Sequence, residues 1–225
     1  MSFEILYEDK NYILAQKPQG MPSQPDKTGD DDILTLCENK TGIKDMSVIN
    51  RLDRPVGGII ILAKNKKAAA ECSALVQNNA VEKEYTAVVC GKIECEEGTF
   101  EDYLVKNAKL NTSSVADKSN KNAKKAVLHY KVLKTVEDEE FGNLSLVRIK
   151  LETGRHHQIR VQFASRKIAL WGDSKYNPAF ARRRGFFNIA LWSSKTSFKD
   201  KFSGKTIEAQ SSPQGEIFEK FKPYE

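Results

Sequence analysis

The chain has 225 residues, of which 40% are hydrophobic and 29% are charged. This length and composition predict a globular protein with a sizeable core and argue against a disordered or fibrous chain. The 36 Lys and Arg residues outnumber the 30 Asp and Glu residues, and the net charge of +6 favours an anionic partner, nucleic acid first. No run of about 18 apolar residues occurs and the start lacks a secretory pattern, so we expect neither a membrane span nor export.

The cysteines predict reduced thiols and not a metal site or a disulfide framework. Cys37, Cys72, Cys90 and Cys95 form no Cys-x-x-Cys pair, and the three histidines do not complete a zinc pattern. Cys72 falls on the apolar face of a predicted helix, and Cys90 ends an apolar segment. We therefore expect a cytoplasmic protein without a metal, with a nucleophilic cysteine as a minor alternative.

The N-terminal part of the chain predicts strands and helices in alternation. Two apolar runs, 5–7 and 12–15, are parted by polar residues and predict a β-hairpin. Residues 33–39 predict a short helix, and an unbroken apolar run predicts a buried strand over 58–63. Residues 65–78 predict an amphipathic helix that begins after an asparagine N-cap.

The remainder predicts mainly strands. Alternating apolar residues predict strands over 81–89, 126–132 and 144–151, of which the last two are antiparallel partners across an acidic turn. Residues 109–125 are polar and Lys-rich, which predicts a mobile surface loop, and a short helix is expected over 157–165. The C-terminal part adds two short strands and a helix, over 189–192, 196–198 and 216–221. Together these elements predict a single α+β domain.

Asp53 lies between two arginines in residues 51–58, Arg-Leu-Asp-Arg-Pro-Val-Gly-Gly, directly before the predicted buried strand. Pro55 restricts the backbone here, while the two glycines permit a tight turn or close approach by another backbone or a ligand. The flanking guanidiniums favour the ionised form of Asp53. The segment therefore predicts a held anion beside cations that can grip a polyanion, and a surface salt bridge on a loop is the alternative.

A second group of polar residues lies in 153–163, Thr-Gly-Arg-His-His-Gln-Ile-Arg-Val-Gln-Phe. Arg155 ends a predicted strand and Arg160 lies in the helix beyond it, so both could point into one cleft. Solvated positive charges are the alternative, because Ile159 and Phe163 at i and i+4 explain the helix without any ligand.

Four segments, in this order, resemble the motifs of RluA-type pseudouridine synthases. They are residues 51–58, Lys-Glu-Tyr-Thr-Ala at 83–87, Thr-Gly-Arg-His-His-Gln-Ile-Arg at 153–160 and Gly-Asp-Ser-Lys-Tyr at 172–176. The opening of the chain also matches the start of that catalytic domain. The resemblance implies an α+β fold with a mixed, largely antiparallel central sheet, flanking helices and a catalytic cleft. It also implies one catalytic domain over residues 1–225, without a preceding S4 domain.

The resemblance implies conversion of uridine to pseudouridine in structured RNA without a cofactor. Asp53 matches the catalytic aspartate, Tyr85 the tyrosine that packs on the target uracil, and Arg160 the arginine that pairs with the aspartate. We expect a monomer that acts on ribosomal RNA of the large subunit, or else on transfer RNA. The residues expected to bind the substrate are Arg51, Arg54, Arg155 and Gln158.

Five residues, in four places along the chain, depart from the family pattern. Asn50 and Gln162 stand where histidine is usual, Val56-Gly57 replaces a common Thr-Ser, and Trp192 stands where we expect another histidine. None of these changes removes the aspartate, the tyrosine or the arginine of the motifs. They bear on the choice of substrate more than on the chemistry.

Two other functions stay open from the sequence. A non-catalytic RNA-binding or RNA-folding protein on the same fold would explain the basic charge and the altered positions. A phosphodiester-cleaving enzyme could use arginines as phosphate clamps, although the sequence lacks a carboxylate cluster for a metal or a paired His base. Weaker candidates for RNA contact are Lys17, the lysines of 118–125 and the three arginines of 182–184.

Overall fold

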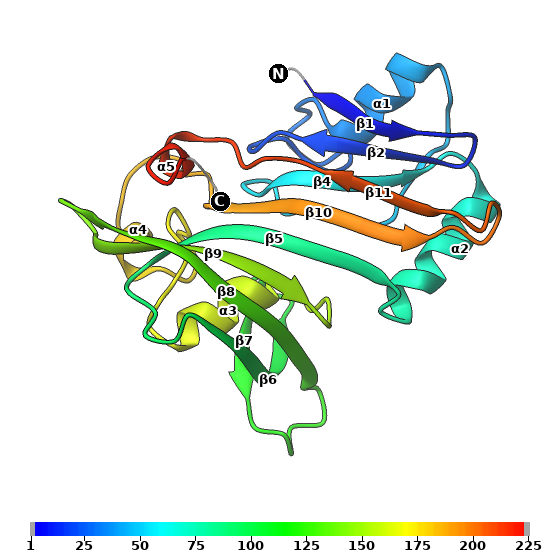
Figure 1. The fold of residues 1–225 in the computed structure, drawn as a ribbon. Coiled ribbons are helices and arrows are strands. Elements are labelled where there is room, and N and C mark those ends of the chain that lie inside the picture. Colours follow the sequence, from blue (N-terminus) through cyan, green and yellow to red (C-terminus); the bar gives the residue numbers. More distant parts are fainter. Residues whose placement is uncertain (1–2, 223–225) are drawn as a thin grey trace. The chain divides into compact units, whose positions relative to one another are not determined.

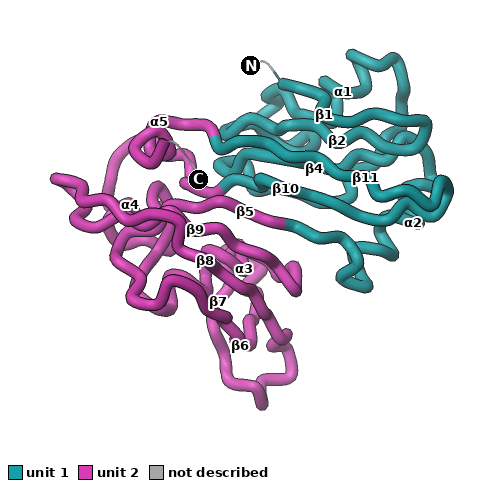
Figure 2. Tube along the Cα trace, viewed as in Figure 1, with its two compact units in different colours: residues 1–83, 192–213 teal, residues 84–191, 214–225 magenta. Residues whose placement is uncertain are grey.

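The computed structural model describes residues 3–222 and divides the chain into two compact units (Figure 2). Unit 1 comprises residues 1–83 and 192–213, and unit 2 comprises residues 84–191 and 214–225. Each unit therefore combines two separate parts of the chain. The single catalytic domain expected from the sequence stays a prediction beside this division.

Unit 1 is built on a sheet in which β1, β2, β4 and β10 follow one another (Figure 1). Strand β11 pairs with β10, and β3 pairs with β4. β1 and β2 form the predicted antiparallel hairpin, whereas β4 and β10 run parallel. The strands are Glu4–Glu8 (β1), Tyr12–Lys17 (β2), Ser47–Val48 (β3), Gly57–Ala63 (β4), Leu191–Lys199 (β10) and Thr206–Gln210 (β11).

Strand β4 is buried on both faces, which explains its unbroken apolar sequence. Alternate residues of its Ile-Ile-Ile-Leu run (59–62) pack with α2 (Lys66–Gln77) on one face and with α1 (Ile33–Thr41) on the other. Complete burial of each such side chain contributes on the order of 1.5–3 kcal/mol. Both helices were predicted, and the N-cap prediction is confirmed because Asn65 Oδ1 accepts a hydrogen bond from Ala68 N at 2.9 Å.

Two glycines at the start of β4 let β10 approach closely. Gly57 lies opposite Trp192, and Gly58 lies opposite Ser193. A Cβ on Gly57 would lie 2.2 Å from the Trp192 ring, and one on Gly58, whose φ is 110°, would lie 2.3 Å from the Ser193 carbonyl oxygen. The close approach predicted from the sequence is confirmed, and Trp192, a departure from the family pattern, forms part of it.

Unit 2 is an antiparallel sheet in the order β5, β9, β8, β6 and β7. Helix α3 packs on β6 and β7, and its Val161 belongs to a hydrophobic cluster with Leu104 of β6 and Ala126 of β8. The bounds are Val81–Cys90 (β5), Glu97–Asn107 (β6), Thr112–Ala116 (β7), Lys124–Asp138 (β8), Gly142–Leu151 (β9), Gln158–Ser165 (α3), Pro178–Ala181 (α4) and Glu216–Glu219 (α5). Among the described residues, no helix has both the length and the apolar character needed to cross a bilayer.

The mobile loop predicted over 109–125 is wrong, because residues 112–116 form β7 and pair antiparallel with 103–107 of β6. β7 reads Thr-Ser-Ser-Val-Ala at the edge of the sheet, where Val115 is exposed. A polar edge strand carries little hydrophobic alternation, so the sequence offered no signal for it. β6, β11 and α4 were not predicted either, and the two short strands expected near the C-terminus are one strand, β10.

The four cysteines are free thiols, as predicted. Burial raises the pKa of Cys37 and of Cys72 to about 12. A thiol with such a pKa carries almost no thiolate at neutral pH, and the thiolate is the nucleophile. These two cysteines therefore act as small apolar side chains of unit 1.

Gly58→Ala is expected to destabilise the protein by at least about 3 kcal/mol, because the methyl group adds a backbone clash to the strain of a positive φ. Gly204→Ala is the matched control: its φ is 70°, but nothing lies within 4 Å of an added Cβ. The control is expected to cost only about 1–2 kcal/mol. Urea unfolding measures both, and equal losses would contradict the close approach of β10.

Candidate active site

Asp53 lies on the turn between β3 and β4, in unit 1. The backbone N–H of Val56 donates to the Asp53 carbonyl oxygen at 2.9 Å, which closes a turn around Pro55. Asp53 itself is half-buried. The turn directly before a buried strand, predicted from the sequence, is confirmed.

The residues that flank Asp53 are tied to the segment that follows β2. Ser23 Oγ donates to the Leu52 carbonyl oxygen at 2.8 Å and accepts from the Leu52 N–H at 3.1 Å. Gly20 N–H donates to the Arg54 carbonyl oxygen at 2.8 Å. Hydrogen bonds on both sides of Asp53 thus restrain the backbone that carries the carboxylate.

Asn50, where the family usually has histidine, fastens the start of this loop to β4. Its Oδ1 accepts from Ile61 N–H at 2.6 Å, and its Nδ2 donates to the Ile59 carbonyl oxygen at 3.4 Å. The amide thus bonds to a donor and an acceptor of the neighbouring strand. The departure therefore has a structural explanation within unit 1.

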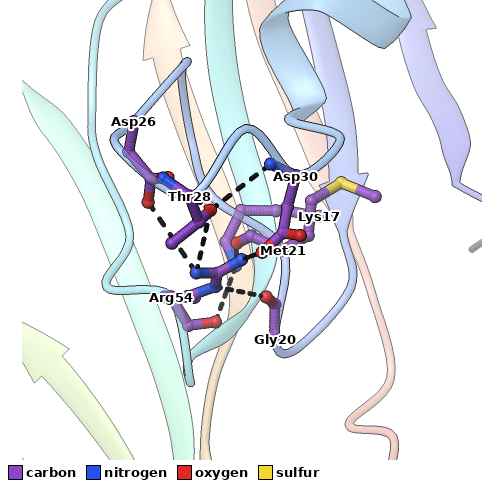
Figure 3. Close-up of polar contacts among 7 residues, drawn as sticks. All are labelled: Lys17, Gly20, Met21, Asp26, Thr28, Asp30 and Arg54. Atoms are coloured by element: carbon purple, nitrogen blue, oxygen red, sulfur yellow. Dashed lines mark hydrogen bonds and ion pairs between the residues drawn. The ribbon is translucent and has the colours of Figure 1, made fainter.

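Lys17, only a weak candidate from the sequence, is completely buried under this turn. Its Nζ donates to the Pro18 carbonyl oxygen at 2.9 Å. It also donates to the carbonyl oxygens of Met21 at 2.7 Å and Arg54 at 3.3 Å (Figure 3). Burial lowers the pKa of Lys17 to about 7; the Asp53 carboxylate opposes this shift and the Arg54 guanidinium adds to it. Because the attraction is mutual, protonated Lys17 also favours the ionised form of Asp53.

The two arginines beside Asp53 differ in their surroundings. Arg54 is half-buried, and its guanidinium contacts oxygen atoms of Gly20, Thr28 and Asp30 (Figure 3). Arg51 is exposed, and its side chain has no hydrogen-bond or ion-pair partner within residues 3–222. The predicted role of both in substrate binding stays a prediction.

Arg160 lies on α3, in unit 2, and is buried together with Asp173. Its Nε donates to Asp173 Oδ2 at 2.7 Å and its Nη2 donates to Oδ1 at 2.8 Å. Asp173 Oδ1 also accepts from the backbone N–H groups of Lys175 at 3.0 Å and Tyr176 at 3.2 Å. The Tyr176 ring centroid lies 5.1 Å from Arg160 Cζ. A bidentate ion pair and an aromatic ring thus fix the orientation of the guanidinium plane.

Asp173 is a residue of the site that sequence reasoning missed, although Gly-Asp-Ser-Lys-Tyr was recognised as a motif. The preceding Gly172 has a φ of 80°, and a Cβ there would lie 2.1 Å from the Asn188 carbonyl oxygen. The glycine is therefore required to place the carboxylate. The predicted pairing of Arg160 with Asp53 stays a prediction beside this observed partner.

Tyr85 lies on β5 in unit 2, in register with Ile149 of β9. The residue is 8% exposed, so protein atoms cover almost the whole side chain. Close packing restricts such a ring to few orientations. Its contact with a uracil stays a prediction.

Gln158 and Arg155 hold the start of α3 against β8. Gln158 Oε1 accepts from Thr153 Oγ1 and from Arg155 N–H, both at 2.9 Å, and its Nε2 donates to the Val127 carbonyl oxygen at 3.0 Å. Arg155 is exposed, and its Nε donates to the Lys125 carbonyl oxygen at 2.8 Å. These contacts explain both positions structurally, and substrate binding by either stays a prediction.

A pair of histidines joins the β6–β7 hairpin to the same helix. The rings of His156 and His157 stack 3.8 Å apart. His156 Nδ1 lies 2.8 Å from Ser113 Oγ, His157 Nδ1 lies 2.8 Å from the Tyr176 hydroxyl, and that hydroxyl accepts from Ser113 N–H at 2.7 Å. Within residues 3–222, no three His, Cys, Asp or Glu side chains gather as ligands for a metal ion.

Gln162, another departure from the family pattern, lies on α3, and its side chain is buried against the sheet of unit 2. Its Nε2 donates to Asp102 Oδ2 at 2.7 Å, to the Phe100 carbonyl oxygen at 3.2 Å and to the Ala126 carbonyl oxygen at 3.3 Å. Arg166 Nη1 donates to the same Asp102 oxygen at 2.8 Å. Gln162 thus orients the helix that carries Arg160.

The groups that the two units hold suit polar, non-redox chemistry. Unit 1 provides the carboxylate of Asp53, which can act as a nucleophile or as a base. Unit 2 provides the fixed guanidinium of Arg160, which can stabilise negative charge, and the aromatic face and phenol of Tyr85.

Lys17→Met is expected to change how stability depends on pH. Because the pKa of about 7 in the folded protein lies below the ordinary value of 10.5, the unfolded chain binds more protons between these values. Wild-type stability should therefore rise relative to that of the variant from about pH 7 to about pH 10, by at most about 1.4 kcal/mol per pH unit. Urea unfolding of both proteins over this range measures it, and a flat or falling difference would contradict the shift.

Arg160→Met is expected to cost about 3–5 kcal/mol of stability, because it leaves the buried carboxylate of Asp173 without its cation. The double variant Arg160→Met, Asp173→Asn should recover part of this loss, since no uncompensated charge remains. Lys201→Met, which breaks an ion pair of an exposed lysine with Glu71, should cost less than about 1 kcal/mol. Urea unfolding distinguishes the three variants, and a double variant no more stable than Arg160→Met would contradict the coupling.

Comparison with known proteins places the chain among RNA-modifying enzymes. The profile of the RNA pseudouridylate synthase family matches residues 11–165. The uncharacterized RNA pseudouridine synthase YlyB of Bacillus subtilis is 32% identical over 216 residues, which cover 92% of this chain and 68% of that protein. The tRNA pseudouridine synthase C of Vibrio parahaemolyticus is 29% identical, over 92% of this chain and 89% of its own length.

The ribosomal large subunit pseudouridine synthase D of Zymomonas mobilis is 28% identical, over 91% of this chain and 67% of that protein. Among solved structures, human RNA pseudouridylate synthase domain containing 1 matches with a TM-score of 0.80 at 19% identity, over 94% of this chain and 84% of its own. This likeness confirms the predicted fold, a mixed, largely antiparallel sheet with few helices. The chain therefore belongs to the RNA pseudouridylate synthase family, as its RluA-type motifs predicted.

Proposed function

We infer that this chain is an RNA pseudouridine synthase, and we propose that Asp53 is the group that acts on the target uridine. The observation that carries the proposal is the Asp53 turn, in which hydrogen bonds on both sides restrain the backbone that carries a half-buried aspartate of the family motif. A catalytic carboxylate has to be held in place before the substrate arrives, because misplacement costs rate.

Pseudouridine formation breaks the N1–C1′ bond of uridine and joins C5 to C1′ after the uracil has turned. A proton leaves C5 and N1 gains one, so the product is an isomer and the reaction consumes no redox cofactor. Asp53 can attack the base, attack the sugar or remove a sugar proton, and each route needs its ionised form. The nearby Lys17, when it is protonated, favours that form.

The proposed roles of the other residues follow from their chemistry. Tyr85 stacks on the target uracil, an interaction worth on the order of 1–3 kcal/mol per base. Arg160 stabilises the ionised form of Asp53 through its guanidinium, which stays positively charged at every relevant pH. The sequence predicts Arg51, Arg54, Arg155 and Gln158 as RNA ligands; of these, Arg54 already contacts Gly20, Thr28 and Asp30.

The target nucleotide has to leave its stack, because enzymes that act on a base cannot reach it inside a duplex. We propose a structured ribosomal RNA of the large subunit as the substrate, with transfer RNA as the alternative; the names of relatives include both classes. A cytoplasmic monomer is part of the proposal, and its oligomeric state is open to size-exclusion chromatography.

Asp53→Ala is expected to lower the reaction rate by at least about a thousandfold, because the group that acts on the nucleotide is gone. Release of tritium from RNA labelled at uridine C5 measures it. Asp45→Asn, which removes an exposed carboxylate, is the control and should retain wild-type rates.

Equal release by wild type and Asp53→Ala would contradict the catalytic role. A non-catalytic RNA-binding protein predicts no release by either protein, with RNA binding intact in both. A phosphodiester-cleaving enzyme predicts shortened RNA on a gel. Mapping carbodiimide-reactive uridine isomers in cells with and without the gene identifies the RNA and the position.

A further inference from the structure

The side chain of Arg54 turns toward the loop of residues 26–30, although the residue directly follows Asp53 (Figure 3). Its Nε donates to the Gly20 carbonyl oxygen at 2.9 Å, and its Nη1 donates to Thr28 Oγ1 at 3.3 Å. Its Nη2 forms an ion pair with Asp30 Oδ2. The guanidinium thus contacts three oxygen atoms of the segment that precedes α1.

The main chain of Arg54 is bound to the same segment. Its carbonyl oxygen accepts from Gly20 N–H at 2.8 Å and from Lys17 Nζ at 3.3 Å. Gly20 and Arg54 therefore bind each other twice, once through the backbone and once through the Arg54 side chain. Rotation of the Asp53 turn away from this segment would break all of these bonds together.

The loop that receives the guanidinium is organised by its own hydrogen bonds. Asp26 Oδ1 accepts from Thr28 N–H at 2.9 Å and from Thr28 Oγ1 at 2.6 Å, and Asp30 N–H donates to Thr28 Oγ1 at 3.3 Å. Hydrogen bonds from Thr28 lower the pKa of both Asp26 and Asp30. The charge of Arg54 lowers both further, and for Asp30 a hydrogen bond from Arg54 adds to the shift. Two carboxylates therefore face Arg54 in ionised form, Asp26 Oδ2 at 3.9 Å from Nη1.

An RNA phosphate that took Arg54 would have to displace these oxygen atoms, whereas Arg51 has no such partner within residues 3–222. We propose that Arg54 is a positioning residue, which clamps the Asp53 turn to the 26–30 loop. Of the two arginines that flank Asp53, Arg51 is then the one that binds RNA. This proposal rests on the catalytic role of Asp53. Exposed ion pairs contribute little to stability, so the clamp should act on catalysis and leave folding intact.

The test compares kcat, KM and RNA affinity in variants of the full chain. Arg54→Ala should lower kcat by about tenfold or more, because the carboxylate is no longer held, while KM and the Kd for RNA stay within about twofold. Arg54→Lys should keep the affinity but not restore kcat, since an ammonium cannot bind Gly20 and Asp30 together as the fork does. Asp30→Asn should lower kcat in the same direction.

Matched controls remove the same charges without touching the clamp. Asp31→Asn neutralises a neighbouring exposed carboxylate of the loop, and Arg148→Ala removes an exposed arginine on β9. Both should keep the wild-type kcat. Thermal unfolding of every variant checks that a loss of activity is not a loss of fold.

The opposite pattern would overturn the proposal. If Arg54 binds a phosphate, Arg54→Ala weakens RNA binding and lowers the slope of log K against log salt by about one, with kcat unchanged. Asp30→Asn would then tighten RNA binding more than Asp31→Asn does. Wild-type kcat and affinity in Arg54→Ala would overturn the proposal as well.

Amide hydrogen exchange separates failure of the clamp from failure of the proposed function. Without RNA, Arg54→Ala and Asp30→Asn should speed exchange at Val56 N–H, which is bonded to the Asp53 carbonyl oxygen, and Asp31→Asn should not. Absence of pseudouridine with wild type refutes the proposed function and leaves this readout intact. Unchanged exchange in Arg54→Ala refutes the clamp even in an active enzyme.

Discussion

The buried amino group of Lys17 is the interaction on which the rest of the Asp53 site depends. Burying a polar group is costly unless hydrogen-bond partners replace water, and here three carbonyl oxygens do so. One of those oxygens belongs to Arg54, so Lys17 has all three hydrogen bonds only when the Asp53 turn lies in place. The stability of β2 and the position of the carboxylate are thereby linked.

Unit 2 also buries a titratable side chain among polar partners, but here the side chain is acidic. Asp173 is a completely buried anion, satisfied by the Arg160 fork and by two backbone N–H groups. A buried ion pair adds little net stability, but removing one partner is expensive, so such a pair fixes geometry more than it strengthens the fold. Fixed charges that need no rearrangement are what electrostatic catalysis requires. Each unit thus holds its charged group before any RNA is bound.

The departures from the family pattern are absorbed by packing and hydrogen bonding. Asn50 bonds to β4, Gln162 joins α3 to the sheet of unit 2, and Trp192 covers Gly57. Each histidine of the usual pattern is replaced by a side chain whose contacts lie within its own unit. The chain has therefore changed how parts of its framework are held, while Asp53, Tyr85 and Arg160 keep the residue types of the motifs.

The sequence by itself determined the elements with strong periodicity, such as β4 and α2, and the motifs that contain Asp53, Tyr85 and Arg160. These signals are local, since they depend on neighbouring residues along one strand, helix or turn. Only the tertiary structure decided that β7 is an edge strand, that Asp173 holds Arg160, and that Arg54 turns to the 26–30 loop. Such pairings join residues 13 and 24 positions apart, and no pattern along the chain specifies which donor meets which acceptor. That choice follows from the packing of strands and helices, which brings the partners within reach.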